Sequence, residues 1–225
     1  VECSVIPVIA YLKDHRAATL DKVSATVEQF VADNKTAGVE LLPAAGAAGI
    51  EAAVNQEVRT AWLKMLAYIY GTVAILCLIA FRSWRAVLVA LLPLALTSVL
   101  CEALMVVLGI GVKVATLPVI ALGVGIGVDY ALYLLSVQLH GQRMGMPLPE
   151  AYRAALAFTG RIVALVGLTL AAGVITWAWS PIKFQADMGI LLAFMFLWNM
   201  LGALILIPAL SYFLLPTSAV RKAKA

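Results

Sequence analysis

The chain sets a carboxylate inside a long apolar run, Leu122-Gly-Val-Gly-Ile-Gly-Val-Asp129-Tyr-Ala-Leu-Tyr-Leu-Leu135. No Lys or Arg stands between Lys113 and Arg143. An ionisable side chain at bilayer depth is costly, and such residues usually face a bundle interior and mark ion or substrate pathways. The stretch therefore predicts a membrane-spanning helix with a functional acid, as a proton-coupled transporter requires.

The composition places the whole chain in the membrane-protein class. Of its 225 residues, 64% are hydrophobic and 12% are charged, whereas soluble domains are nearer half apolar and a quarter charged. Residues 1–64 carry eight acids against six bases, and the remainder carries four acids against ten bases. The net charge of +4 therefore belongs to the membrane part, and it indicates topology rather than nucleic-acid binding.

Five apolar segments predict an all-α membrane bundle over residues 62–225. Each is near the ~20 residues that cross a hydrocarbon core of ~30 Å. The segments are 62–81, 86–108, 116–138, 162–179 and 188–215, with Pro208 expected to kink or end the last one.

A preceding extramembrane domain is expected over residues 1–61. The apolar run 5–12 is typical of a strand, 20–31 has helical spacing, and 39–42 reads as a second strand. A further helix is expected from about residue 50 towards 62. We therefore expect part of an α/β domain here. Because the chain starts at Val1 and begins in a polar, foldable segment, it is expected to be a fragment or one half of a longer polypeptide.

The basic residues predict the orientation, because Lys and Arg favour the cytoplasmic side. The connection 139–160 is expected to carry an amphipathic helix on the membrane surface, with Ala151, Ala154, Ala155 and Phe158 on one face; whether it also binds a partner stays open. The N-terminal segment is then periplasmic and the basic tail 216–225 is cytoplasmic, in a bacterial inner membrane. The bases on the cytoplasmic side are Arg82, Arg85, Arg143, Arg153, Arg161, Arg221, Lys222 and Lys224, against Lys113 and Lys183 opposite.

Two acids are candidates for proton transfer. Asp129 is about thirteen residues into its span, near the midplane at ~1.5 Å per residue. An acid at that depth can change charge during a cycle, which a proton carrier needs. Glu102 lies late in the preceding span, nearer the outer interface, where a structural role is as well supported as a relay role.

Small and hydroxyl residues surround Asp129 in the sequence. Gly123 and Gly127 form a small-xxx-small pair that lets another helix approach, and the spacing places Tyr130 on that face. Gly125, which also belongs to this glycine-rich packing segment, shares a face with Asp129. Candidates elsewhere are Thr169, a possible relay near mid-span, and Asn199, expected to bond between helices.

Nothing in the sequence indicates an enzyme. The triple glycine is a poor match to a phosphate loop, since no strand precedes it and no Lys-Ser/Thr follows. Cys3, Cys77 and Cys101 have no metal-type spacing. We expect no cofactor or metal, with protons as the coupling ion.

The motif Gly125-Ile-Gly-Val-Asp129-Tyr130 resembles the Gly-x-Gly-x-Asp-Tyr signature in the tenth helix of resistance–nodulation–division transporters, in the branch called MMPL. Weaker likenesses lie at residues 11–15, 45–49 and 158–160, and at Leu168-Thr169, although Leu170 stands where a second Thr is common. The resemblance covers essentially the whole chain.

The resemblance implies two six-helix halves, each with an external porter lobe, of which this chain is the C-terminal one. Asp129 and Tyr130 would face the matching pair of the N-terminal half. Proton-driven export of hydrophobic or lipid-like cargo would follow, with membrane lipids and that half as partners. A protein-export accessory motor of the same superfamily and a non-transporting sensory or scaffold protein stay open, as do homo-oligomers and periplasmic or outer-membrane partners.

Overall fold

The computed structural model of the chain describes residues 6, 8–9, 11–14, 17–34, 46–111 and 116–215. They divide between two compact units, Val1–Thr60 and Ala61–Ala225. The first unit contains helix α1 (Ala17–Asp33) and the beginning of α2 (Ala47–Phe81). Among the described residues of this unit, the buried apolar ones are Leu20, Ala52 and Val58.

The strands expected in the first unit are not found where the structure can show them. Residues 6, 8–9, 11 and 12 of the expected strand 5–12 are not in a strand, and the expected strand 39–42 lies outside the described residues. A strand needs a neighbour to pair its backbone groups, and the described residues contain no strand. What is described here is therefore helical, and the expected α/β character is not seen.

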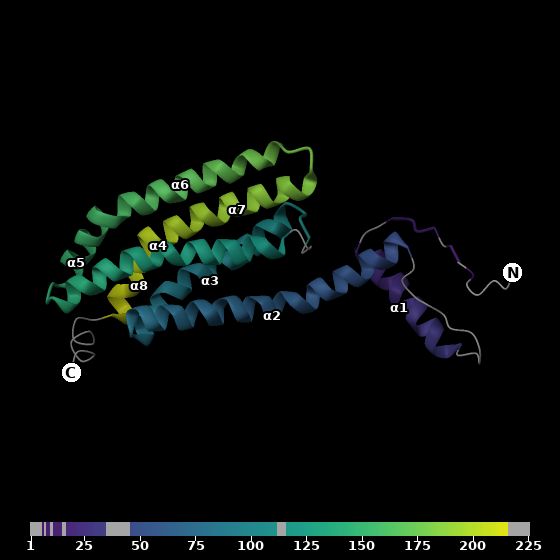
Figure 1. Cartoon of the computed structure of the whole chain (residues 1–225), viewed down its shortest axis with the longest axis horizontal. Helices are drawn as coiled ribbons and strands as arrows, with labels where there is room; N and C mark the ends of the chain where they lie inside the picture. The colour runs from purple at the N-terminus through teal and green to yellow at the C-terminus, as the bar shows by residue number, and fades with distance from the viewer. Residues whose placement is uncertain are drawn as a thin grey trace. The chain divides into compact units, whose positions relative to one another are not determined.

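The second unit is a helical bundle with five stretches long and apolar enough to cross a membrane (Figure 1). This confirms the five predicted spans. The stretches are α2; α3 (Trp84–Val107); α4 (Leu117–Arg143); α5 (Leu148–Ala155) with the π segment η1 (Leu156–Gly160), α6 (Arg161–Ile175) and the 3-10 turn η2 (Thr176–Trp179); and α7 (Lys183–Leu201) with the π segment η3 (Gly202–Leu206) and α8 (Ile207–Leu214).

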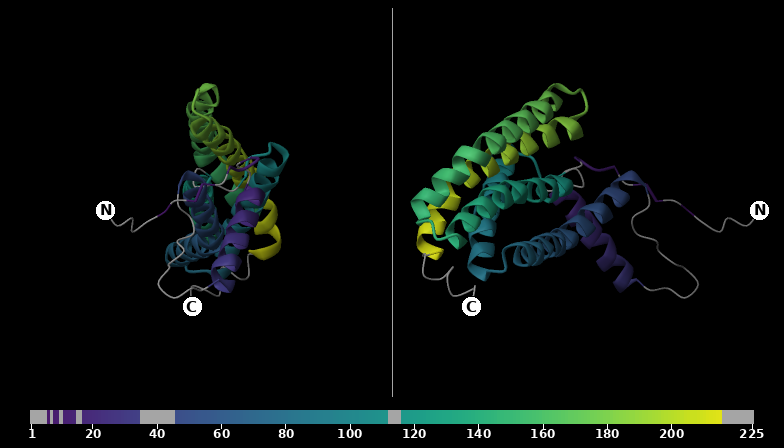
Figure 2. Two further views of the ribbon diagram at one scale, coloured as in Figure 1. Left: turned by 90° about the vertical axis from the view of Figure 1, so that its right-hand side faces the viewer. Right: turned by 60° about the vertical axis from the view of Figure 1, so that its left-hand side comes forward.

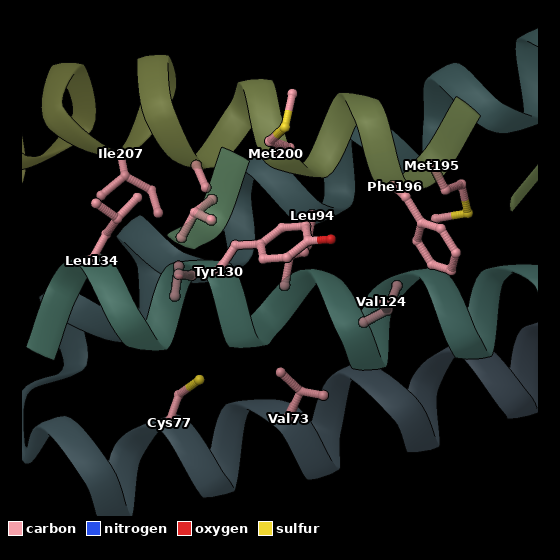
Figure 3. Packing of buried hydrophobic residues seen from close by; sticks show 14 of the residues in the cluster. Val73, Cys77, Leu94, Val124, Tyr130, Leu134, Met195, Phe196, Met200 and Ile207 are labelled. Atoms are coloured by element: carbon pink, nitrogen blue, oxygen red, sulfur yellow. The ribbon is translucent and has the colours of Figure 1, made fainter. Parts of the chain in front are cut away.

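Helix α4 carries the predicted acid. It packs against α3, α5 and α7, while α6 packs mainly along α7 (Figure 2). Its residues Val119, Ile120, Val124 and Leu134 are wholly buried. Figure 3 shows Val124, Tyr130 and Leu134 of α4 among apolar side chains of α7 and α8. The bundle thus holds one face of the predicted acid-bearing helix in its core.

The expected connection 139–160 is much shorter in the structure. Helix α4 continues to Arg143, α5 begins at Leu148, and a four-residue turn, 144–147, joins them with Gly145 at φ +95°. Helix α5 packs on α4 and runs through η1 into α6. Its buried face is Ala151, Ala155 and Thr159, whereas Ala154 and Phe158 are exposed. The expected face was therefore wrong, because neighbouring alanines give no preference for one rotation of so short a helix.

A tyrosine hydroxyl bonds the backbone where the last span changes its helical register. Pro208 does not end this span; it stands in the first turn of α8, directly after η3. Because proline has no N–H, the carbonyl of Leu204 lacks its usual donor four residues later. The Tyr152 hydroxyl of α5 donates to this carbonyl at 2.7 Å. The bond ties α5 to the irregular turn of the last span.

Candidate functional site

Helix α4 has a buried face and an exposed face. The exposed side chains recur every three or four residues, so they form one stripe along the helix. In the second unit, the stripe is not covered by any other described helix. We call it the Asp129 stripe; it consists of Leu122, Gly125, Asp129, Tyr133 and Ser136.

Asp129 lies in the middle of this stripe. It is twelve residues after Leu117, where α4 begins, which is roughly 18 Å along the helix axis. Its carboxylate makes no hydrogen bond or ion pair with the residues that the structure describes. An acid at this depth on an uncovered helical face is available to a proton or to a polar partner.

The opposite face of α4 carries two glycines at a close helix crossing. A Cβ on Gly123 would come within 2.5 Å of the Met195 side chain, and one on Gly127 within 2.6 Å of Leu94 Cδ2 and also against Asn199. The Asn199 amide donates to the Gly123 carbonyl at 2.7 Å. Asn199 therefore makes the bond between helices that the sequence predicted, in a space that exists because both positions lack a side chain.

Gly125 does not take part in this packing. A Cβ built on it would meet nothing within 4 Å, and the residue lies on the Asp129 stripe. Two residues of α-helix turn the chain by about 200°, so Gly125 and Gly127 point in nearly opposite directions. Its assignment to helix packing is corrected for this chain.

Tyr130 lies on the buried face, 1% exposed. Figure 3 shows its ring between the α4 and α7 ribbons, and its hydroxyl has no hydrogen-bond partner among the described residues. The tyrosine is thus directed into this bundle, while Asp129 is directed out of it. The expected contact of both residues with the matching pair of a second half stays a prediction.

Glu102 belongs to a different polar group. Leu94 of α3 lies against Gly127 of α4. Glu102 is eight residues later on α3, which is about 12 Å further toward the Leu117 end of α4. Ser98, one turn before Glu102, hydrogen-bonds Tyr70 of α2 at 2.7 Å, and Glu102 interacts electrostatically with Tyr70. The structure therefore places Glu102 with α2 rather than with Asp129.

Thr169 also stands apart. Its hydroxyl donates to the carbonyls of Leu165 at 2.9 Å and Val166 at 3.0 Å, within its own helix. The side chain is exposed, and α6 packs on α7 rather than on α4. The structure does not bring the four predicted relay residues together, and of the four only Asp129 lies on the exposed stripe of α4.

Three buried polar residues near the Arg143 end of α4 were missed by sequence reasoning. Gln138 and Gln142 are 0% and 5% exposed on α4, and Ser211 of α8 is 0% exposed. Two glutamines four residues apart in a membrane span could have been recognised in the sequence, since that spacing places both on one helical face.

The described residues hold no group of three His, Cys, Asp or Glu that could bind a metal ion.

Comparison with known proteins identifies relatives of the chain. A family model described as the MMPL family matches residues 10–224. A protein of Methanocaldococcus jannaschii that is named as a membrane protein is 28% identical over 138 residues, or 61% of this chain and 36% of its own length. A Streptomyces coelicolor protein, also named as a membrane protein, is 39% identical over 90 residues, or 40% of this chain and 13% of its own length. The matched residues thus span about a third of the first relative and about an eighth of the second.

Proposed function

The chain belongs to the MMPL family, and from this premise we propose that it is part of an exporter of hydrophobic or lipid-like molecules driven by the proton motive force. The observation that carries the proposal is the position of Asp129. It stands mid-span on an exposed stripe of α4 and makes no bond to the described residues of this chain.

The free-energy cost of exposing Asp129 to lipid favours further helices packed against the Asp129 stripe. A carboxylate at the bilayer centre costs about 2.5–3.5 kcal/mol on insertion scales. Covering the stripe with helices of a second six-helix half removes Asp129 from lipid. Gly125, one turn before Asp129, has no side chain to obstruct that approach, and Tyr133, one turn after, supplies a hydroxyl.

In this proposal, the coupling step is protonation of Asp129. The charged carboxylate favours a polar or hydrated neighbour, and the neutral acid tolerates an apolar one. Binding and release of a proton would therefore change which arrangement of the two halves is stable, and the rearrangement would reach an external porter lobe. No cofactor, nucleic acid or enzymatic step is needed.

The proposed orientation places the Arg143 end of α4 in the cytoplasm. Arg82 and Arg85 lie at the joint between α2 and α3, and Arg153 and Arg161 lie beyond the turn that follows α4. Such clustering of basic residues is typical of the cytoplasmic side. The first unit would then be extracytoplasmic, with α1 as a helical part of the porter lobe, and the membrane would be a bacterial inner membrane.

Export measured in cells tests this proposal. Asp129→Asn keeps the size of the side chain but cannot titrate, so cells making the full-length variant should retain a fluorescent amphiphile that the wild type exports. Asp187→Asn is the matched control, because Asp187 lies within the first turns of α7 rather than mid-span. Equal export by both variants, at equal protein levels, would favour the sensory or scaffold alternative.

A further inference from the structure

Several buried polar atoms of α4, α7 and α8 have no hydrogen-bond partner among the described residues. All belong to side chains at most 5% exposed, so external solvent does not reach them in this bundle. The atoms are the Tyr130 hydroxyl, both amide atoms of Gln138, Oε1 of Gln142, Oδ1 of Asn199 and Oγ of Ser211.

Two hydrogen bonds fix how α4 lies beside the last span. Asn199 donates to the Gly123 carbonyl at 2.7 Å, and Gln142 Nε2 donates to the Leu215 carbonyl at 3.4 Å. The residue numbers rise together along both helices, so they run parallel. Ser211 is one turn before Leu215, and Gln138 is one turn before Gln142. Ser211 therefore lies level with Gln138.

An apolar layer divides these polar groups. Leu134 of α4 and Ile207 of α8 are 0% and 1% exposed, and Figure 3 shows them pointing toward one another. Tyr130 and Asn199 lie on one side of this layer. On the other side lie Gln138, Gln142 and Ser211, which we call the glutamine cluster.

The glutamine cluster needs more hydrogen-bond partners than the described residues supply. A glutamine amide has two donors and two acceptor lone pairs, and a serine hydroxyl donates once and accepts twice. Among the described residues, the side chains of the cluster make one hydrogen bond, from Gln142 to Leu215, and it is long for an N–H···O bond. Water both donates and accepts, and internal waters in proteins typically bind such otherwise unpaired buried groups.

We infer that the glutamine cluster is a binding site for internal water at the Arg143 end of the bundle, closed toward Tyr130 and Asn199 by Leu134 and Ile207. Gln138 is nine residues from Asp129, which is about 900° of helical rotation, or the opposite side of α4. The hydrated cluster is therefore a separate site from the acid. Under the proposed function, it would let α4 exchange hydrogen bonds with water as it moves against α8.

Water-edited solid-state NMR of the full-length protein in lipid bilayers tests the inference. With ¹⁵N-glutamine labelling, the Gln138 side-chain amide, assigned by its loss in Gln138→Met, should receive magnetisation from water about as fast as exposed Gln56. The backbone amide of Leu134, labelled with ¹⁵N-leucine, should receive it several-fold more slowly.

Transfer to Gln138 as slow as transfer to Leu134 would overturn the inference and mean that the amide pairs within the protein. Equally fast transfer to Gln138 and Leu134 would overturn the apolar layer. Neither result depends on transport activity, so the failure of this inference and the failure of the proposed function are distinguishable.

Discussion

Asp129 and Tyr130 are adjacent in the sequence but serve different faces of α4. Asp129 lies on the exposed stripe, and Tyr130 is 1% exposed between α4 and α7. One residue of α-helix turns the side chain by about 100°, which is enough to place Asp129 on the exposed stripe and Tyr130 in the core of this bundle. In this chain, the Tyr130 side chain therefore packs in the core, away from the exposed stripe.

The helix crossing at Gly127 should be sensitive to a single methyl group. A Cβ there would lie 2.6 Å from Leu94 Cδ2, and overpacking typically costs about 1–3 kcal/mol. Gly127→Ala should therefore lower the melting temperature of the purified full-length protein. Gly173→Ala in α6 is the control, since nothing lies within 4 Å of a Cβ built there. An unchanged melting temperature for Gly127→Ala would contradict the close crossing.

Asn199 should contribute a hydrogen bond at the same crossing. Asn199→Leu removes the 2.7 Å bond to Gly123 but leaves a side chain of similar size. Hydrogen bonds between membrane helices average about 0.6 kcal/mol, so the loss in unfolding free energy should be modest, with α4–α7 packing retained. An equilibrium denaturation curve in detergent measures the free energy of unfolding of Asn199→Leu and of the wild type. A gain in stability for Asn199→Leu would show that the bond contributes nothing.

The bond from Tyr152 to Leu204 should matter because Pro208 removes the usual donor. Tyr152→Phe should lower the unfolding free energy by about 1 kcal/mol, a typical net value for one hydrogen bond. Pro208→Ala restores an N–H four residues after Leu204, so the same Tyr152→Phe change should cost less in that background. Tyr212→Phe is the control, since Tyr212 is 71% exposed. Equal losses in both backgrounds would show that the hydroxyl does not replace the missing donor.

The orientation can be measured at two exposed basic positions. Arg153→Cys and Lys183→Cys, each in a background without the native cysteines, lie at the ends of different spans. A membrane-impermeant maleimide added to intact cells should label position 183 and not position 153. The reverse pattern would invert the proposed topology.

Much of the second unit could be predicted from the sequence, because spans of about 20 apolar residues and the three-to-four-residue spacing around Asp129 are strong signals. Other features depend on information that local patterns do not hold. Ala151 and Ala154 are identical in chemistry, so only the contact of α5 with α4 decides which is buried. Thr169 could not be placed either, because its distance from Asp129 depends on α6 packing on α7. In the first unit, an apolar run at residues 5–12 favours a strand, but a strand also needs a partner.

Proton flux into proteoliposomes, followed with an internal pH dye under an imposed pH gradient, tests the central claim about Asp129 most directly. The full-length wild type and Asp187→Asn should carry protons in the presence of an amphiphilic cargo, whereas Asp129→Asn should carry none at equal reconstitution. Proton flux through Asp129→Asn at the wild-type rate would contradict the account, because the mid-span carboxylate would then not be the group that takes up and releases the proton.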